Sequence, residues 1–304
     1  MRFIGKERQM SEIIRLINDL AVNEKTVLVI GGPTASGKSG LALAAALKYN
    51  GVVINADAMQ VYQNIPIITA VPTVEDRQKV QHVLYEIYPP SEKGNVADWL
   101  TKATASVRQA WNDKKLPIVV GGTGFYIESL IKGCSPIPDT KEEIKLQVAE
   151  TMQKKGLAAT YEYLSEIDSF GAEMVKSNDT TRIRRALEIK LDTGKSIAEW
   201  FKQPLIKLLP EADFQMIKLL PELKTLEEKC SQRFDLMMEH GALKEVENLL
   251  NLKLDKNLPA MKAIGVPELS DYLDGKTNLN EAITLAKLHT RQYAKRQLTW
   301  FRNR

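Results

Sequence analysis

A lysine and a serine close the glycine-rich run GPTASGKS at residues 32–39. The run matches the pattern G-x-x-x-x-G-K-[ST], in which backbone amides surround phosphate oxygens, the lysine reaches the terminal phosphate and the hydroxyl joins a Mg²⁺ shell. It lies between an apolar run and a helical stretch, which is the context this motif requires. The sequence therefore predicts a phosphate site on Lys38 and Ser39. ATP, GTP and a diphosphate ester would all fit the same amides, so the motif leaves the reaction open.

Asp57 is a second residue that could take part in chemistry, because it ends the apolar run VVINAD at residues 52–57. Ligands of open α/β sheets bind at the carboxyl ends of the strands, beside the loop after the first strand. A carboxylate at that edge could bind Mg²⁺ or accept a proton. The structural alternative is that Asp57 caps a following helix, a position where aspartate is favoured.

The segments that must position these residues alternate between strand-like and helical patterns. Such alternation predicts βαβ units and a parallel sheet covered on both faces. From about residue 139 the strand-like runs stop and charged helical patterns take over, so we predict an α/β core, residues 1–138 and 201–304, with a helical insertion domain at 139–200. The strands are expected at 26–32, 52–57, 116–127 (ending in Gly121-Gly122) and 214–220, and the helices of the core at 7–20, 38–49, 96–113, 224–250, 259–273 and 279–302.

Length and composition exclude several classes of protein. A chain of 304 residues suggests about two domains. Its 44% hydrophobic and 26% charged residues are typical of a globular protein, and a formal charge of +4 permits a polyanionic partner without requiring one. The two cysteines, Cys134 and Cys230, are too far apart for a zinc motif. No signal-peptide core or transmembrane run is found, so we expect a cytoplasmic protein without membrane contact.

Basic residues gather at the end of the chain, where the last 18 residues contain no acid. Arg291 and Lys295 are four residues apart and share one helix face. A stripe of one sign is what a nucleic-acid backbone requires. The alternative is a solvated basic face without a partner.

Six segments in one order extend this reading: GPTASGKS, NADAMQVY, VVGGTGFYIESLIKG, NDTTRIRRALEI, RFDLMMEHGALKEV and TRQYAKRQLTWFR. With them the chain resembles the tRNA isopentenyltransferase family, the bacterial tRNA dimethylallyltransferases, over about residues 25–304. The resemblance implies a P-loop NTPase-like core with a helical insertion. It also implies transfer of a dimethylallyl group from its diphosphate to the exocyclic amine of the adenosine 3′ to the anticodon of tRNA.

The same resemblance assigns roles to individual residues. Asp57 is the expected general base, and Thr123 holds Asp57 or the amine in line. Mg²⁺ is the expected cofactor, with Ser39 as its protein ligand. The expected partners are dimethylallyl diphosphate and a tRNA anticodon stem-loop, with the protein itself a monomer. The diphosphate is expected on Gly32, Thr34, Ala35, Ser36, Gly37, Lys38, Ser39 and Arg233, and the tRNA on Asp57, Ala58, Met59, Gln60, Thr181, Arg182, Ile183, Arg184, Arg185, Arg291 and Lys295.

Three other functions stay open on the sequence. A P-loop nucleotide kinase would use the same loop but has no reason for a basic C-terminal segment. A prenyltransferase of free AMP would need neither that segment nor the insertion. A non-catalytic RNA-binding descendant would fit the loss of a family lysine at Val71 and of a histidine at Val83, but not the intact Lys38, Asp57 and Thr123.

Overall fold

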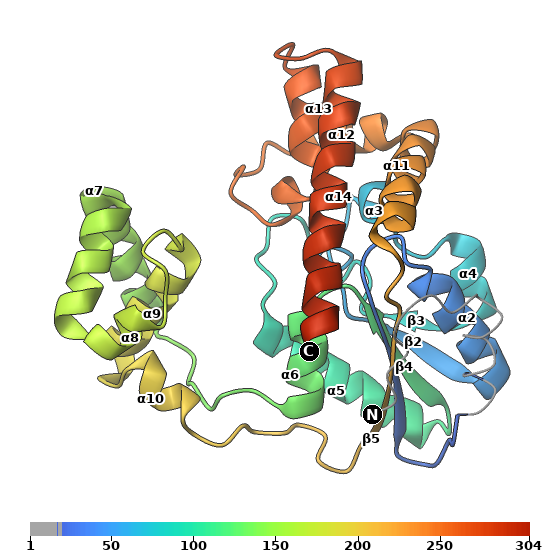
Figure 1. Cartoon of the computed structure of the whole chain (residues 1–304), viewed down its shortest axis with the longest axis horizontal. Coiled ribbons are helices and arrows are strands. Elements are labelled where there is room, and N and C mark those ends of the chain that lie inside the picture. Colours follow the sequence, from blue (N-terminus) through green and yellow to red (C-terminus); the bar gives the residue numbers. More distant parts are fainter. Residues whose placement is uncertain (1–16, 18–19) are drawn as a thin grey trace. The chain divides into compact units, whose positions relative to one another are not determined.

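The computed structural model describes residue 17 and residues 20–304, so the helix expected at 7–20 lies almost entirely outside the described part. The chain divides into two compact units, Met1–Ile131 with Leu209–Arg304, and Lys132–Leu208 (Figure 1). The expected insertion, 139–200, lies inside the second unit, whose bounds extend further on both sides.

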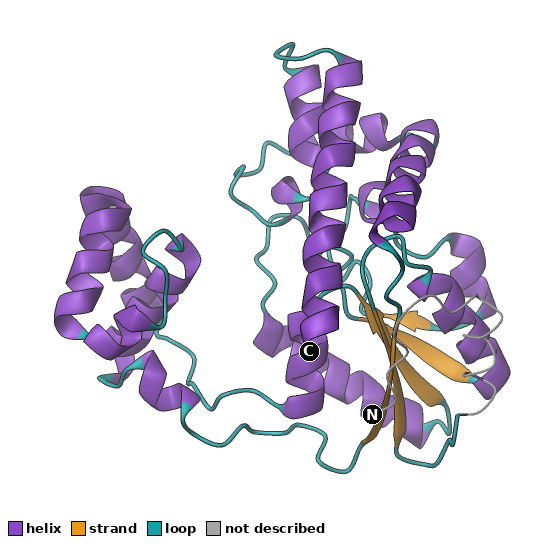
Figure 2. Cartoon of the chain, viewed as in Figure 1, coloured by secondary structure: helices purple, strands orange, loops and turns teal. Residues whose placement is uncertain are grey.

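The first unit is built on a five-stranded sheet in the order β3-β2-β4-β1-β5 (Figure 2). Every neighbouring pair is parallel, which confirms the predicted α/β class. Only β3 was not predicted, because a strand of two residues is too short to show a period. The strands are β1 (Thr26–Gly31), β2 (Gly51–Asn55), β3 (His82–Val83), β4 (Leu116–Gly121) and β5 (Asp213–Lys218).

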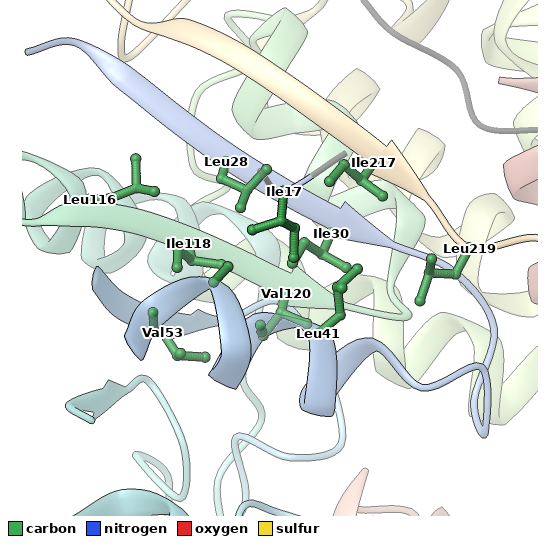
Figure 3. Packing of buried hydrophobic residues seen from close by; sticks show 13 residues of the cluster. Ile17, Leu28, Ile30, Leu41, Val53, Leu116, Ile118, Val120, Ile217 and Leu219 are labelled. Carbon is green, nitrogen blue, oxygen red and sulfur yellow. The ribbon is translucent and has the colours of Figure 1, made fainter. Parts of the chain in front are cut away.

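Both faces of the central strands are buried, which explains their continuous apolar runs. On one face Leu28, Ile30 and Ile118 pack with the small residues of α2 (Lys38–Tyr49) (Figure 3). The alternate residues, such as Val29 and Val119, are also fully buried and point to the opposite face. There α5 (Val96–Asn112) is anchored at both ends by indole N–H groups: Trp99 donates to the Asn55 carbonyl and Trp111 to the Thr26 carbonyl.

Glycines determine where three of the predicted stretches end or divide. The stretch 116–127 is strand to Gly121, where its end was expected, and the residues after the glycines belong to α6 (Gly124–Lys132), which was not predicted. The stretch 224–250 is divided at Gly241, with φ of 97°, and 259–273 at Gly265, with φ of 106°; such left-handed conformations end a helix. The resulting helices are α11 (Leu223–Glu239), α12 (Ala242–Leu250), the short 3₁₀ helix η1 (Ala260–Lys262), α13 (Val266–Leu273) and α14 (Leu279–Asn303), and two further short helices are α3 (Pro66–Thr69) and α4 (Val74–Lys79).

The second unit is helical, with its own core around Val148, Leu164 and Leu187. Its first helix is kinked at Gly156, which has φ of 77° and ψ of 172°. Paired backbone hydrogen bonds between Cys134 and Ile206 join the segments that enter and leave the unit. Its helices are α7 (Glu142–Ile167), α8 (Ser169–Glu173), α9 (Thr180–Thr193) and α10 (Ile197–Phe201).

Among residues 17 and 20–304, no helix is both long enough and apolar enough to span a bilayer.

Candidate active site

Three loops of the first unit meet at one edge of the sheet. Strands β2, β4 and β1 are parallel neighbours, so the loops that follow them leave at the same carboxyl edge. A cavity of about 280 Å³ opens there, lined by residues 34–40 of the P-loop, by Asp57 and Gln60, and by Arg233 from α11. The fold therefore brings together the P-loop, Asp57 and Arg233, which are far apart in the sequence.

The P-loop turns its backbone inward through two left-handed residues, Ala35 with φ of 60° and Gly37 with φ of 89°. Gly37 begins α2 without a side-chain cap, so the amides of the first turn are available to an anion. A Cβ on Gly32 would lie 2.6 Å from the Leu219 carbonyl oxygen, so the first glycine is required by close packing. The Ser36 hydroxyl is buried without a hydrogen-bond partner among the described residues, as expected for a donor that serves a ligand.

Lys38 follows the loop, and its ammonium donates to the Pro33 carbonyl oxygen at 2.6 Å, across the mouth of the turn. Burial lowers the pKa of Lys38 to about 8; nearby Asp57 opposes this shift and Arg233 adds to it. At neutral pH the side chain is therefore charged but inadequately compensated. A bound anion would restore the missing negative charge.

The pKa of Lys38 leads to a prediction for the pH dependence of ligand binding. The affinity for inorganic diphosphate should fall as the pH rises through about 8, because Lys38 then loses its charge. Above that pH the loss should approach about tenfold per pH unit. Isothermal titration calorimetry should also detect proton uptake on binding.

Lys38→Arg is the matched control, since arginine stays protonated over this range. Titration of the ligand itself is common to both proteins, so the ratio of the two affinities isolates the lysine. A ratio that does not change with pH would contradict the assignment of the lowered pKa to Lys38.

Arg233 is the second cation of the cavity and comes from α11. Its Nε is buried and has no hydrogen-bond partner among the described residues, and burial lowers its pKa. An unpaired guanidinium nitrogen is costly to bury unless an anion occupies the site. The guanidinium fork is suited to phosphate oxygens.

Asp57 is held by the side chain of Asn55, the last residue of β2. The Asn55 amide oxygen accepts from the Asp57 amide at 2.9 Å, and its Nδ2 donates to the Asp57 and Leu84 carbonyl oxygens. Asp57 Oδ1 accepts from the Met59 amide at 2.9 Å. The carboxylate therefore caps a turn and not a helix, because the next helix, α3, begins only at Pro66.

Thr123 faces this turn from the loop after β4. Its Oγ1 accepts from the Ala58 amide at 2.8 Å, which leaves the hydroxyl proton to be donated. Its own amide donates to the Ala56 carbonyl oxygen at 3.2 Å. Gly121 permits this close approach, since a Cβ there would lie 2.0 Å from the same carbonyl oxygen. Thr123 is thus both a turn residue and a neighbour of Asp57.

A second cavity, of about 330 Å³, adjoins the first and shares Thr34, Asp57, Thr69 and Arg233 with it. Most of the remaining wall is apolar, including Ile68, Phe234, Met237, Ala263 and Ile264, and polar groups are added by Lys262, Thr290, Tyr293 and Arg296. A polar phosphate cavity next to an apolar cavity, with a carboxylate at their junction, suits a ligand with an anionic head and a small hydrocarbon tail.

The hydroxyl of Ser39 is the one protein oxygen of the P-loop expected to serve a Mg²⁺ ion. Within the described residues, no three His, Cys, Asp or Glu side chains are grouped to hold a metal. Ser39 is exposed at the start of α2, beside the phosphate cavity. Mg²⁺ keeps several waters and is commonly bound through substrate phosphates, so one protein hydroxyl is sufficient.

Of the residues expected to contact tRNA in the first unit, Ala58, Met59 and Gln60 are half-buried beside Asp57. Gln60 donates to the carbonyl oxygens of Thr69 and Ala70 at 2.9 and 2.7 Å, so its amide nitrogen holds the cavity wall. On α14, Lys295 is exposed.

Arg291, the other basic residue expected on α14, is only partly exposed. It lies close enough to Cys230 on α11 to affect that thiol electrostatically. Arg291 therefore faces the cavity side of the helix more than Lys295 does.

In the second unit the five residues expected to contact tRNA differ in accessibility. Thr181 and Arg182 are exposed at the start of α9, and Arg184 is partly exposed and pairs with Glu188 at 2.7 Å. Arg185 donates to the Thr140 hydroxyl at 2.6 Å. Ile183 is fully buried, so its side chain packs in the core of the unit.

Gln297 and Tyr293 approach the P-loop and the loop after β4 from α14, and neither was among the expected site residues. Gln297 is 6% exposed and bonds to the P-loop and to the loop after β4. Burial raises the pKa of the Tyr293 hydroxyl, and Gln297 and Thr123 lie close enough to oppose that shift. A glutamine four residues after a tyrosine on the buried face of a basic helix was the available signal.

Comparison with known proteins agrees with this geometry. A family model described as IPP transferase matches residues 60–304. The tRNA dimethylallyltransferase of Zymomonas mobilis is 40% identical over 277 residues, which cover 91% of this chain and 88% of that protein. The Bartonella henselae protein of the same name is 42% identical over 279 residues, covering 92% of this chain and 96% of that protein.

Solved structures give the same result. The tRNA isopentenylpyrophosphate transferase of Bacillus halodurans is 35% identical, with a TM-score of 0.65 over 93% of this chain and 88% of that one. A eukaryotic dimethylallyltransferase acting on tRNA is 32% identical, with a TM-score of 0.79 over 91% of this chain and 69% of that one. The resemblance read from six sequence segments is confirmed: this chain belongs to the IPP transferase family, the family of the tRNA dimethylallyltransferases.

Proposed function

We propose that this protein transfers a dimethylallyl group from dimethylallyl diphosphate to the exocyclic amine of the adenosine 3′ to the anticodon of a tRNA, releasing diphosphate. The observation that carries the chemistry is the junction of the two cavities at Asp57. The phosphate cavity provides for the leaving group, and the apolar cavity provides for the hydrocarbon and for a base removed from its stack.

Departure of the diphosphate is the first requirement of this reaction. The negative charge that develops on the leaving oxygen is stabilised by Lys38, by Arg233 and by the amides at the start of α2. These groups are already oriented before the reaction begins, which is the condition for effective electrostatic stabilisation. A Mg²⁺ held by Ser39 and the phosphate oxygens would add positive charge to the same leaving group.

Attack by the amine is the second requirement. The lone pair of an adenine amine is delocalised into the ring, so removal of an N–H proton assists bond formation. Asp57 is the base we assign, and it is positioned by Asn55 and by the Met59 amide. General-base assistance of this kind is typically worth about 10²- to 10⁴-fold. The Thr123 hydroxyl keeps the amine or Asp57 in line.

A single assay tests the proposal against the alternatives. The protein is incubated with radiolabelled dimethylallyl diphosphate and then offered unmodified tRNA, AMP or no acceptor. We expect label in the tRNA only. Label in AMP would favour a prenyltransferase of free nucleotides. The absence of label from both acceptors would favour the non-catalytic RNA-binding protein. Steady hydrolysis of ATP stimulated by a small phosphate acceptor would instead favour a kinase.

The tRNA would contact basic residues of both units, Arg182 in the second and Lys295 in the first. Lys295→Gln should weaken tRNA binding and reduce the slope of log K against log salt by about one, the value for one lost phosphate contact. Filter binding between about 50 and 200 mM salt covers the sensitive range.

Lys276→Gln is the matched control, because Lys276 is an exposed lysine paired with Asp271 and Asp274. Neither change should alter the thermal shift produced by dimethylallyl diphosphate. A wild-type salt slope for Lys295→Gln would mean that this part of α14 is a solvated face.

Mg²⁺ as cofactor, a cytoplasmic location and a monomeric state belong to the same proposal. The position of Ser39 beside the phosphate cavity supports the assignment of Mg²⁺. A tRNA substrate supports the cytoplasmic location.

A further inference from the structure

Gln297 is a polar residue on the buried face of α14. Its neighbours on that face, Ala294, Leu298 and Phe301, are apolar and at most 2% exposed. A leucine would fill such a position at no cost in desolvation, whereas a buried amide is costly unless its donors and acceptors are paired. The two ends of the Gln297 amide are therefore expected to have specific partners.

Those partners are two loops of the active site. Gln297 Oε1 accepts from the Thr34 amide at 2.8 Å, across 263 residues of sequence. Its Nε2 donates to the Gly122 carbonyl oxygen at 2.9 Å. One side chain thus joins the start of the P-loop to the loop after β4.

The second bond leads directly to the proposed base. Gly122 precedes Thr123, whose hydroxyl accepts from the Ala58 amide next to Asp57. A Cβ on Gly122 would lie 2.3 Å from Gln297 Nε2 and 3.4 Å from Asp57 Oδ2. Gly122 is therefore enclosed between the glutamine and the carboxylate, with no room for a side chain.

The first bond concerns the phosphate site. The amides of residues 34–39 were expected to serve the diphosphate, but the Thr34 amide is directed to α14. Gln297 thereby determines where the phosphate-binding turn begins. The Tyr293 hydroxyl, one helical turn earlier, lies close enough to Gln297 and Thr123 for both to affect its pKa.

We propose that Gln297 is a positioning residue for the transfer reaction, which joins the phosphate-binding turn to the Asp57–Thr123 pair and sets their separation. It contacts neither the diphosphate nor the amine and acts through Thr34 and Gly122. This role rests on the proposed transferase function. It differs from a packing role because it depends on one donor and one acceptor at the end of the side chain.

Gln297→Glu converts that dependence into a pH-dependent signal. A protonated glutamate has one O–H donor and one carbonyl acceptor, so it reproduces both bonds of glutamine. An ionised glutamate is acceptor-only and would face the Gly122 carbonyl oxygen. Burial and the nearby Asp57 raise the pKa of the introduced carboxyl, whereas Lys38 and Arg233 lower it. Tyr293, whose own pKa is raised, stays protonated and neutral over the range tested.

The measurement is single-turnover transfer at saturating tRNA and dimethylallyl diphosphate, from about pH 5.5 to about pH 8. The rate of Gln297→Glu relative to the unaltered protein should rise at least about tenfold as the pH falls. An ionised carboxylate facing a carbonyl oxygen replaces a hydrogen bond by a repulsion, which costs about 10- to 100-fold. Gln297→Leu, which fills the space without either bond, should be slow at every pH. The dissociation constant for dimethylallyl diphosphate should change less than about threefold, because Lys38 and Arg233 are intact.

Gln292→Glu is the control for charge, because Gln292 is exposed on the same helix. Its relative rate should stay near one throughout. Melting temperatures confirm that each variant is folded at the assay temperature.

The outcomes separate this role from the function on which it rests. If the unaltered protein transfers the label but the relative rate of Gln297→Glu does not change with pH, or Gln297→Leu is as fast as the unaltered protein, the positioning role is wrong and the function remains. If the unaltered protein transfers nothing to tRNA, the proposed function fails and this role with it.

Discussion

Asp57→Asn should lower the single-turnover rate of dimethylallyl transfer at least about 100-fold, the lower end of general-base effects. The asparagine oxygen can still accept from the Met59 amide, so the turn that Asp57 caps should survive. Binding of tRNA and of dimethylallyl diphosphate should therefore stay near normal. Rapid-quench kinetics at saturating substrates isolates the chemical step.

Asp57→Ala separates the two roles of the carboxylate, because alanine removes both the base and the cap. If the base role is correct, the Asp57→Asn and Asp57→Ala variants should be similarly slow, and only Asp57→Ala should also lower the melting temperature. If the Asp57→Asn variant transfers the group at a near-normal rate while Asp57→Ala does not, Asp57 acts only as the cap of the turn.

Arg233→Met should cost about 10²- to 10³-fold in the transfer rate, the range for loss of one preorganised group that stabilises developing negative charge. The folded protein should keep its stability or become slightly more stable, because the variant removes a guanidinium whose buried Nε has no hydrogen-bond partner among the described residues. The two effects have opposite signs, which is a signature of a group retained for function.

The transfer rate of Arg233→Lys should lie between those of the unaltered protein and Arg233→Met, because lysine keeps the charge but cannot form the bidentate pair. Lys224→Met, an exposed lysine of the same helix, is the matched control and should leave the rate unchanged. A normal rate for Arg233→Met would remove Arg233 from the diphosphate site. A large loss of stability would show instead that the guanidinium has a structural partner.

Some features of the site could be predicted because they depend on residues close together in the chain. The glycine spacing of the P-loop and the β-branched runs before it specify a strand, a turn and a helix locally. Asp57 could be placed at the carboxyl edge because every strand of a βαβ series ends on the same side. The parallel sheet followed from the alternation of patterns, and β1, β2, β4 and β5 lie within two residues of the expected starts.

Other features depended on contacts between distant segments, which no local pattern encodes. The glycines at 241 and 265 were expected within helices, yet the structure uses them for left-handed turns that divide those helices. Ile183 lies among arginines in the sequence but inside the core of its unit, because a helix turns every third or fourth residue to the same side.

The sequence by itself therefore determined the chemistry available to this protein: a phosphate-binding loop, a carboxylate at the end of the second strand and a basic C-terminal helix. Only the tertiary structure decided how these are assembled. It brought Arg233, with its buried Nε, close to Lys38 and directed the Thr34 amide to Gln297, 263 residues away. Helical periodicity predicts that a side chain is buried, but the identity of its partner depends on how the helix packs on the sheet.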